Sequence, residues 1–93
     1  MILFVVSIHD RAAQAYGRPA FVASLGAGIR SFQDEVNRPA DDNLMHKHPH
    51  DFDLYSLGTF DDANGLFSLE SAPKLLQRGQ DSVYSAEQIR SVK

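Results

Sequence analysis

The stretch Phe52–Glu70, FDLYSLGTFDDANGLFSLE, contains two apolar-rich runs joined by the segment DDANG at residues 61–65. An Asn-Gly pair between two such runs is a strong signal for a β-hairpin. Residues 62–64 suit a type I turn, and Gly65 suits the left-handed position that closes a three-residue loop with a bulge. The stretch therefore predicts a hairpin in which Asp62 lies opposite Leu66.

The register of this hairpin decides which side chains form its apolar face. With Asp62 opposite Leu66, one face carries Tyr55, Leu57, Phe67 and Leu69, and another element must cover it. A tight Asn-Gly turn would shift the pairing by one residue and bring together a different set on one face, namely Phe52, Leu54, Phe60, Phe67 and Leu69. The sequence leaves both registers open.

Two further strands are predicted before the hairpin. The continuous apolar run Ile2–Val6 is typical of a strand that is buried on both faces, so we expect it at the centre of the sheet. Residues 11–19 read as a connection, because Gly17 and Pro19 interrupt regular structure. Residues 21–23, Phe-Val-Ala, then predict a short second strand.

An amphipathic helix is predicted over residues 25–37. Ser24 suits its N-cap, and its apolar residues recur at helical spacing, at Leu25, Ile29, Phe32 and Val36. Asn37 suits the end of the helix, and Pro39 prevents its continuation. We expect this apolar stripe to cover the hairpin. Residues 38–51 are polar and contain prolines, which predicts a loop.

These elements predict an α+β fold, a small antiparallel or mixed sheet of about four strands covered by one main helix, in the sequence order β-β-α-β-β. Residues 1–70 are predicted to form a single domain. Residues 71–93 are predicted to be a basic C-terminal tail that is partly disordered or weakly helical, with residues 85–92 as the candidate helix.

Composition and charge limit the classes of function. The chain has 93 residues, 43% of them hydrophobic, and no cysteine, which fits one small domain in a reducing compartment. No apolar run is long enough to span a bilayer, and the apolar N-terminus lacks the basic region of a signal peptide, so a cytoplasmic location is predicted. The net charge is −3, but residues 1–70 carry −5 and residues 71–93 carry +2. An acidic body argues against a dedicated nucleic-acid coat, and a basic tail suggests a partner.

Two blocks of sequence carry a family resemblance. Residues 28–39, GIRSFQDEVNRP, and residues 48–65, HPHDFDLYSLGTFDDANG, resemble the small nonstructural DNA-binding protein of gokushoviruses, which are Microviridae-type phages with single-stranded DNA. The shared patterns are a helix reading roughly A-I-R-x-F-x-x-x-V-N and a segment P-x-D-[YF]-x-L-[YF]-x-x-G-x-[FY]-D before a glycine turn. Gly28 and Asn64 depart from the family, where alanine and threonine are common. The matching positions are Ile29, Arg30, Phe32, Val36, Asn37, Pro49, Asp51, Phe52, Leu54, Tyr55, Gly58, Phe60, Asp61 and Gly65.

This resemblance implies a function in phage genome replication inside the infected host cell, where DNA binding would favour single-strand production for packaging. We expect nonspecific binding to single-stranded DNA through phosphate contacts and base stacking. The alternative is a protein–protein interaction module that binds a phage or host replication protein, or itself, without touching DNA. Small size and exposed edge strands also favour a homodimer.

The predicted nucleic-acid contacts are cationic side chains and one aromatic ring. Arg30 lies off the apolar stripe of the helix, where a phosphate contact competes with ordinary pairing to Asp34. Tyr16 is a predicted stacking platform, although aromatic residues in so small a domain usually belong to the core. The full set is Arg11, Tyr16, Arg18, Arg30, Arg38, Lys47, Lys74 and Arg78.

Chemistry at a metal or a catalytic centre is not predicted. His46, His48 and His50 alternate on one segment and are the candidate metal ligands, but they lie in a polar loop without a fixed partner set, so only adventitious binding is expected. No nucleophile elbow, phosphate-binding loop or paired-acid motif is present. We therefore expect neither a cofactor nor an enzymatic activity.

Overall fold

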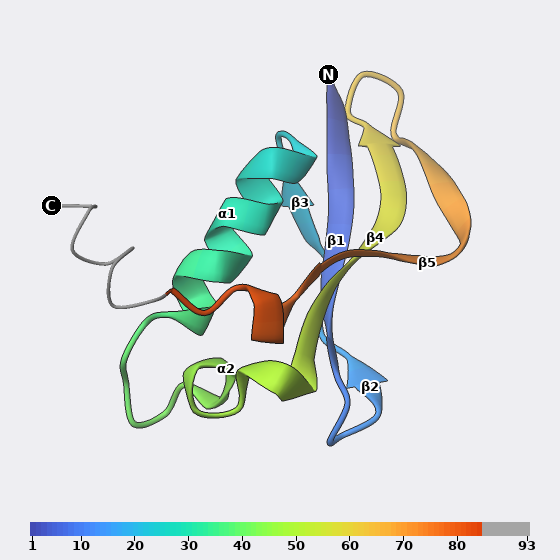
Figure 1. The fold of residues 1–93 in the computed structure, drawn as a ribbon. Helices are drawn as coiled ribbons and strands as arrows, with labels where there is room; N and C mark the ends of the chain where they lie inside the picture. Colours follow the sequence, from blue (N-terminus) through green and yellow to red (C-terminus); the bar gives the residue numbers. More distant parts are fainter. Residues whose placement is uncertain (85–93) are drawn as a thin grey trace, which may run out of the picture.

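β1, Ile2–Asp10, is the central strand of the sheet in a computed structural model that describes residues 1–84. It pairs antiparallel along its whole length with β4, Phe52–Asp61. Its other edge is shared by two short strands, β2, Ala15–Tyr16, and β3, Ala20–Val22 (Figure 1). The central position predicted from the apolar run is confirmed. The predicted second strand is β3, which begins one residue earlier than expected.

The molecule is an α+β fold with an antiparallel sheet in the order β2-β1-β4-β5, in which β3 also pairs with β1. The predicted order β-β-α-β-β differs from the observed one by the two-residue strand β2 and by a four-residue helix, α2, Leu44–Lys47. Both elements are too short to produce a periodic pattern, so the sequence showed only connections there. Within residues 1–84, no helix has the length and apolar character needed to cross a membrane.

The predicted hairpin is formed by β4 and β5, Leu66–Arg78, but both predicted registers are wrong. Asp61, not Asp62 or Ala63, lies opposite Leu66. The Asp61 side chain accepts a hydrogen bond from the Ala63 amide at 2.9 Å, and the Asn64 side chain accepts one from the Leu66 amide at 3.0 Å. These local bonds stabilise a longer loop than the expected ones. Gly65 does adopt the left-handed conformation, with φ of 75°.

A bulge in β4 changes which hairpin residues share a face. The register shifts between Ser56 and Gly58, so Leu57 is an extra residue without a cross-strand partner. Because side chains alternate along a strand, one extra residue places Tyr55 and Phe60 on the same face. Gly58 has φ of 142°, which residues with a Cβ rarely adopt, and the β5 backbone occupies the place of a side chain there.

Helix α1, Leu25–Val36, covers the opposite face of the sheet from the one that carries Tyr55 and Phe60 (Figure 1). Ser24 caps it by accepting a hydrogen bond from the Ala27 amide at 3.1 Å, as predicted. The predicted stripe forms the core, where Phe32 and Val36 are buried against Val6 of β1 and Leu54 of β4, and these residues pack with Ile8, Val22, Leu25, Ile29, Met45, Phe52 and Leu76. The helix therefore covers the Leu54 side of β4 and leaves Phe67 and Leu69 uncovered, which corrects the expectation that it covers the apolar face of the hairpin.

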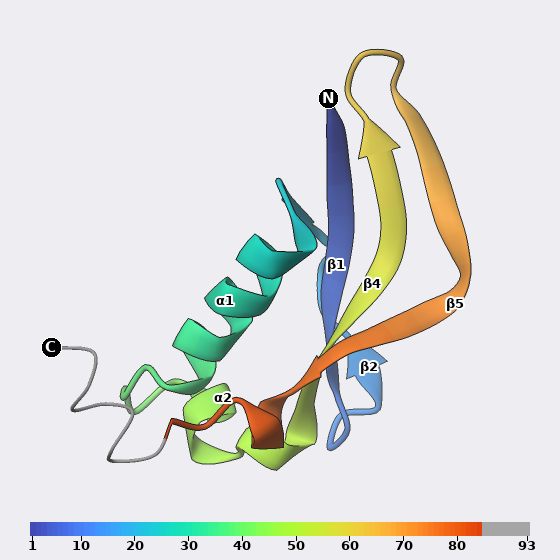
Figure 2. The same cartoon turned by 45° about the horizontal axis from the view of Figure 1, so that its top comes forward.

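The segment after residue 70 is part of the fold. β5 bends sharply midway and continues to Arg78, where Leu76 packs on the core (Figure 2). The Asn37 side chain then donates to the Ser82 carbonyl at 2.7 Å and accepts from the Tyr84 amide at 2.8 Å. The predicted domain boundary at residue 70 falls inside β5, so residues 71–84 do not form a separate tail. The helix predicted over residues 85–92 lies outside the described residues.

Candidate nucleic-acid interface

The face of the sheet opposite α1 carries a group of rings at the C-terminal end of β1. His9 of β1, Tyr16 of β2 and Tyr55 of β4 contact one another, and we call them the lower aromatic cluster. The His9 ring centroid lies 4.6 Å from that of Tyr16 and 6.1 Å from that of Tyr55, and the two tyrosine centroids are 5.5 Å apart. Register explains the grouping, because His9 pairs with Tyr16 and Tyr55 pairs with Ser7, which lies two residues before His9 on the same face.

A second group of rings, the upper aromatic cluster, lies on the same face toward the hairpin loop. Its members are Phe21 of β3, Phe60 of β4 and Phe67 of β5. Phe60 lies 4.7 Å from Phe67 and 5.5 Å from Phe21 between ring centroids, and Phe21 and Phe67 are 6.2 Å apart. β3 and β5 are the two outer strands at this level, so the sheet must curl toward this face to bring their rings together. We call the whole surface the open face.

Two arginines flank the lower aromatic cluster. The Arg11 guanidinium donates from Nε at 3.0 Å and from Nη2 at 2.7 Å to Oδ2 of Asp53, whose side chain is only 3% exposed. Arg11 also donates from Nη1 to the His50 carbonyl at 3.1 Å, which holds the guanidinium in place. Asp53 pairs with His9 on one side and with Arg78 on the other, so both arginines lie beside the rings. Arg11 and Arg78 outnumber the carboxylate that they flank, Asp53.

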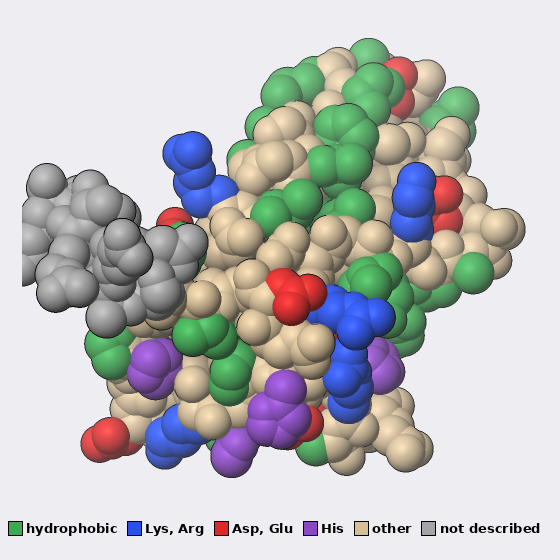
Figure 3. All heavy atoms as spheres, viewed as in Figure 1, with side chains coloured by type: hydrophobic (Ala, Val, Ile, Leu, Met, Phe, Trp, Pro, Cys, Tyr) green, Lys and Arg blue, Asp and Glu red, His purple; other side chains and the backbone are tan. Residues whose placement is uncertain are grey.

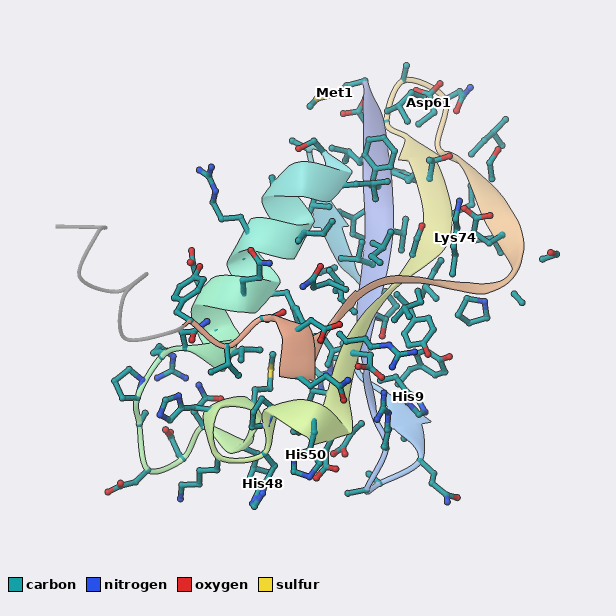
Figure 4. All side chains as sticks on the ribbon, viewed as in Figure 1. Met1, His9, His48, His50, Asp61 and Lys74 are labelled. Carbon is teal, nitrogen blue, oxygen red and sulfur yellow. The ribbon has the colours of Figure 1, made fainter. Side chains whose placement is uncertain are left out.

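Of the predicted contact residues, three come together at the lower aromatic cluster, namely Arg11, Tyr16 and Arg78. Lys74 lies on the same strand as Arg78, but it pairs with Ser56 of β4. Ser56 in turn pairs with the core residue Val6 of β1. Lys74 therefore projects from the edge strand toward the helix side of the sheet (Figure 4).

The other predicted contacts lie away from the open face. Arg30 is exposed on α1, and Lys47 ends α2. Arg38 forms a two-point ion pair with Glu35, at 2.9 and 2.8 Å, and this hydrogen bonding lowers the pKa of the Glu35 carboxyl. Arg18 lines a hollow of about 320 Å³ between α1 and β1, whose floor includes Phe32. The structure thus divides the predicted set into a group at the rings and a scattered remainder.

The three histidines of the loop do not form a common site. His46 turns toward the end of α1, where its Nδ1 lies 3.0 Å from the Val36 carbonyl oxygen. His50 lies with its Nε2 3.6 Å from Asp51 Oδ1, and both His48 and His50 are exposed at the lower end of the molecule (Figure 4). Among residues 1–84, no three side chains of the metal-binding types are close enough to hold an ion.

Sequence reasoning missed three members of the site, His9, Tyr55 and Asp53. His9 was read as a strand end and Tyr55 as part of a face that the helix covers, whereas the helix packs on the Leu54 side of β4 and leaves Tyr55 on the open face. Asp53 had no part in the predicted nucleic-acid contacts. Alternation from the core residue Leu54 is the one signal that would have placed Asp53 on the face opposite the helix.

Side-chain types are unevenly distributed along the molecule. In the view of Figure 3, hydrophobic side chains dominate the end near the hairpin loop, whereas the histidines and several arginines and lysines gather at the opposite end. The lower aromatic cluster with Arg11 and Arg78 therefore combines rings and positive charge, and the upper aromatic cluster is purely apolar.

Comparisons with known proteins identify relatives of this chain. A family model described as "Phage ORF5 protein" matches residues 3–82. The protein named "Protein ORF5" of Chlamydia phage 1 is 39% identical over 69 residues, which cover 72% of this chain and 72% of that protein. No solved structure matches the fold.

Proposed function

We propose that this chain, which belongs to the phage ORF5 protein family, binds single-stranded DNA without sequence specificity during replication of a phage genome. Its relative comes from Chlamydia phage 1, a gokushovirus of the Microviridae, so the gokushovirus resemblance read from the sequence is confirmed and the chain is a phage protein. The DNA would enter on the open face at the lower aromatic cluster. The strand would be held there for packaging in the cytoplasm of the infected host cell.

One observation carries this proposal, the combination of uncovered rings with two arginines on one face of a sheet. Tyr16 is 46% exposed, and it contacts both His9 and Tyr55, so a base has a ring surface on which to stack. Stacking on an aromatic ring contributes about 1–3 kcal/mol per base and works with every base, which gives binding without sequence readout. Arg11 and Arg78, which flank Asp53 beside these rings, would contact the phosphates of a strand stacked there.

Charge sets the expected strength of binding. The net charge of −3 repels DNA at long range, so the local positive charge near Asp53 has to act at short range. We expect a dissociation constant that is micromolar or weaker at physiological salt. Its logarithm should depend on the logarithm of salt concentration with a slope of about 0.7 per phosphate contacted.

The direct test measures anisotropy of a fluorescent oligothymidine as the full chain is added, at several salt concentrations. Tyr16→Ala should weaken binding by about fivefold or more, and Arg78→Gln should also reduce the salt slope by about 0.7. Arg30→Gln is the matched control, because it removes the same charge from the exposed side of α1. If Arg30→Gln weakens binding as much as Arg78→Gln, the contact surface is not the open face.

A second candidate function is that of an interaction module, and the apolar character of β5 favours it. Leu66, Phe67, Leu69 and Leu75 of this strand are all exposed. An exposed apolar edge strand is suited to pairing with another protein strand. A phage or host replication protein would be the partner in that case. The anisotropy experiment separates the two functions, because this module would bind no DNA even at low salt.

A further inference from the structure

The outer edge of β5 has two halves that differ in their protection against pairing. β5 is the last strand in the order β2-β1-β4-β5, and none of residues 1–84 forms a strand beyond its outer edge (Figure 2). Its second half contains Pro73 and Lys74, which are the residue types that natural edge strands use to prevent association. Its first four residues, Leu66–Leu69, contain no proline and no charged residue, and the first charged residue is Glu70. The start of the strand is therefore the least protected part of the edge.

These first residues of β5 also include its most exposed apolar side chains. Leu66 is 65% exposed, Phe67 54% and Leu69 71%. Phe67 and Leu69 lie on the open face, because they pair with Phe60 and Gly58. We call Leu66–Glu70 the β5 arm.

The backbone of the β5 arm presents free hydrogen-bonding groups at Phe67 and Leu69. The Asp62 amide donates to the Met1 carbonyl, so at this position β4 directs its backbone groups toward β1. Since these groups alternate along a strand, those of Asp61 and Thr59 face β5, where Leu66 and Ser68 lie opposite them. The N–H and C=O groups of the intervening residues, Phe67 and Leu69, then point away from the sheet.

We propose that the β5 arm pairs antiparallel with the β5 arm of a second copy of this chain, about a two-fold axis at Ser68. This pairing places Phe67 opposite Leu69 of the second copy and Leu69 opposite Phe67. Each of these pairs is of the hydrogen-bonded type, so the outward backbone groups are satisfied and apolar side chains meet on the open face. A closed dimer with one such interface follows from the two-fold symmetry.

Charge and register favour a second copy about this axis over other arrangements. With Ser68 at the axis, Glu70 lies opposite Leu66, so two acidic chains meet without opposing like charges. An axis at Phe67 would oppose Leu69 to Gly65, and the apolar pairing would be lost. An axis at Ala72 would oppose Glu70 to Lys74, but it would also place Pro73, which has no N–H group to donate, opposite Ser71 of the second copy. Of these three arrangements, the Ser68 axis is the one that pairs the outward groups of Phe67 with those of Leu69.

The dimer joins two sheets into one and brings the two upper aromatic clusters side by side across the axis. Phe67 belongs to the upper aromatic cluster, and in the dimer it would lie next to Leu69 of the second copy. The lower aromatic clusters stay at the far ends of the joined sheet. The dimer therefore does not require DNA, and it is compatible with DNA binding on each copy.

Two measurements test the dimer with the full chain. The first is sedimentation at increasing protein concentration, in which the wild-type chain should shift from monomer to dimer. Leu69→Lys should raise the dimer dissociation constant about tenfold or more, because it places a charge in the apolar pair. Leu75→Lys is the matched control on the same strand and the same face, 41% exposed but outside the β5 arm, and it should leave the dimer intact. Thermal melting of each variant verifies folding.

The second measurement is disulfide cross-linking. Because the chain has no cysteine of its own, any disulfide must form at the introduced residue. At the axis, Ser68 faces Ser68 of the second copy in a non-hydrogen-bonded pair, with Cα atoms about 4.5 Å apart, within the range of about 4.4–6.8 Å that a disulfide spans. Ser68→Cys should form a disulfide-linked dimer under mild oxidation, and Ala72→Cys, which marks the alternative axis, should not. A chain that stays monomeric at millimolar concentration, equal effects of Leu69→Lys and Leu75→Lys, or faster cross-linking of Ala72→Cys would each overturn the proposal.

Discussion

Gly79 lies directly against the backbone of Pro49, so a side chain at residue 79 would collide with the Pro49 carbonyl oxygen and with that of Phe52. This contact joins the end of β5 to the turn that precedes β4. Gly79→Ala should lower the free energy of unfolding by about 3 kcal/mol or more, because backbone atoms cannot move aside as side chains do. Urea denaturation measures this loss.

The control for this substitution is Gly26→Ala, in the first turn of α1. A Cβ at residue 26 would meet no atom within 4 Å. Alanine is the better helix former, so this variant should be more stable than wild type by up to about 1 kcal/mol. If Gly79→Ala melts at the wild-type temperature, residues 49 and 79 are not in contact in solution.

The second half of β5 should be needed for stability. Leu76 packs on the core, whereas its neighbour Leu75 is exposed on the open face. Leu76→Ala should therefore cost about 1–3 kcal/mol, and Leu75→Ala should change stability by less than about 0.5 kcal/mol. Chemical denaturation of the two variants compares them directly. A chain that ends at Ala72 should fail to fold, which reverses the expectation from the sequence that residues 71–93 are a tail outside the domain.

This reversal shows where the sequence is informative and where it is not. The central strand and helix α1 could be predicted because long apolar patterns with caps identify them, as Ser24 and the stripe ending at Val36 do. The role of Leu76 could not be predicted, since a half-buried residue between a proline and a glycine has no periodic pattern. Its position is decided by the bulges in the β4–β5 pairing.

The candidate site was predicted in part for the same reason. Arg11, Tyr16 and Arg78 were recognised by their chemical types, but types alone gave no means of separating them from Arg30 or Lys47. Grouping depends on strand pairing between residues far apart in the sequence, such as Asp53 with Arg78. The extra residue Leu57 puts Phe60 on the same face as Tyr55, and sequence patterns do not reveal such a bulge.

Phe32 should be a key residue of the core. It is almost completely buried between α1 and the sheet, with Val6, Val36 and Leu54 around it. Phe32→Ala should lower the free energy of unfolding by about 3–5 kcal/mol, a large part of the stability of so small a domain. Thermal melting followed by circular dichroism should show a cooperative transition at a much lower temperature, or none. A wild-type transition would contradict the assigned packing of α1.

Zinc should have little effect on stability. His46 contacts the end of α1, and His48 and His50 are exposed, so the loop offers no preformed set of ligands. Weak binding to such histidines is similar in the folded and unfolded chain and shifts the folding equilibrium very little. The melting temperature with and without equimolar zinc should agree within about 2 °C. A clear rise that disappears in His48→Ala would indicate a real site.

Arg11 should stabilise the fold by compensating the buried charge of Asp53. Oδ2 of Asp53 accepts both hydrogen bonds from Arg11, and Oδ1 is buried without a hydrogen-bond partner among the described residues. Arg11→Gln would leave this carboxylate without its cation, at a cost of about 1–3 kcal/mol, moderated by the partial exposure of Arg11.

Arg78→Gln is the control, since Arg78 lies opposite Asp53 without an ion pair to it, and it should cost less than about 0.5 kcal/mol. The double variant Arg11→Gln/Asp53→Asn removes the charge as well as its partner and should recover part of the loss. Urea denaturation at pH 7 measures all three variants. If Arg11→Gln and Arg78→Gln cost the same, or if Asp53→Asn brings no recovery, the charge of Asp53 is not balanced by Arg11.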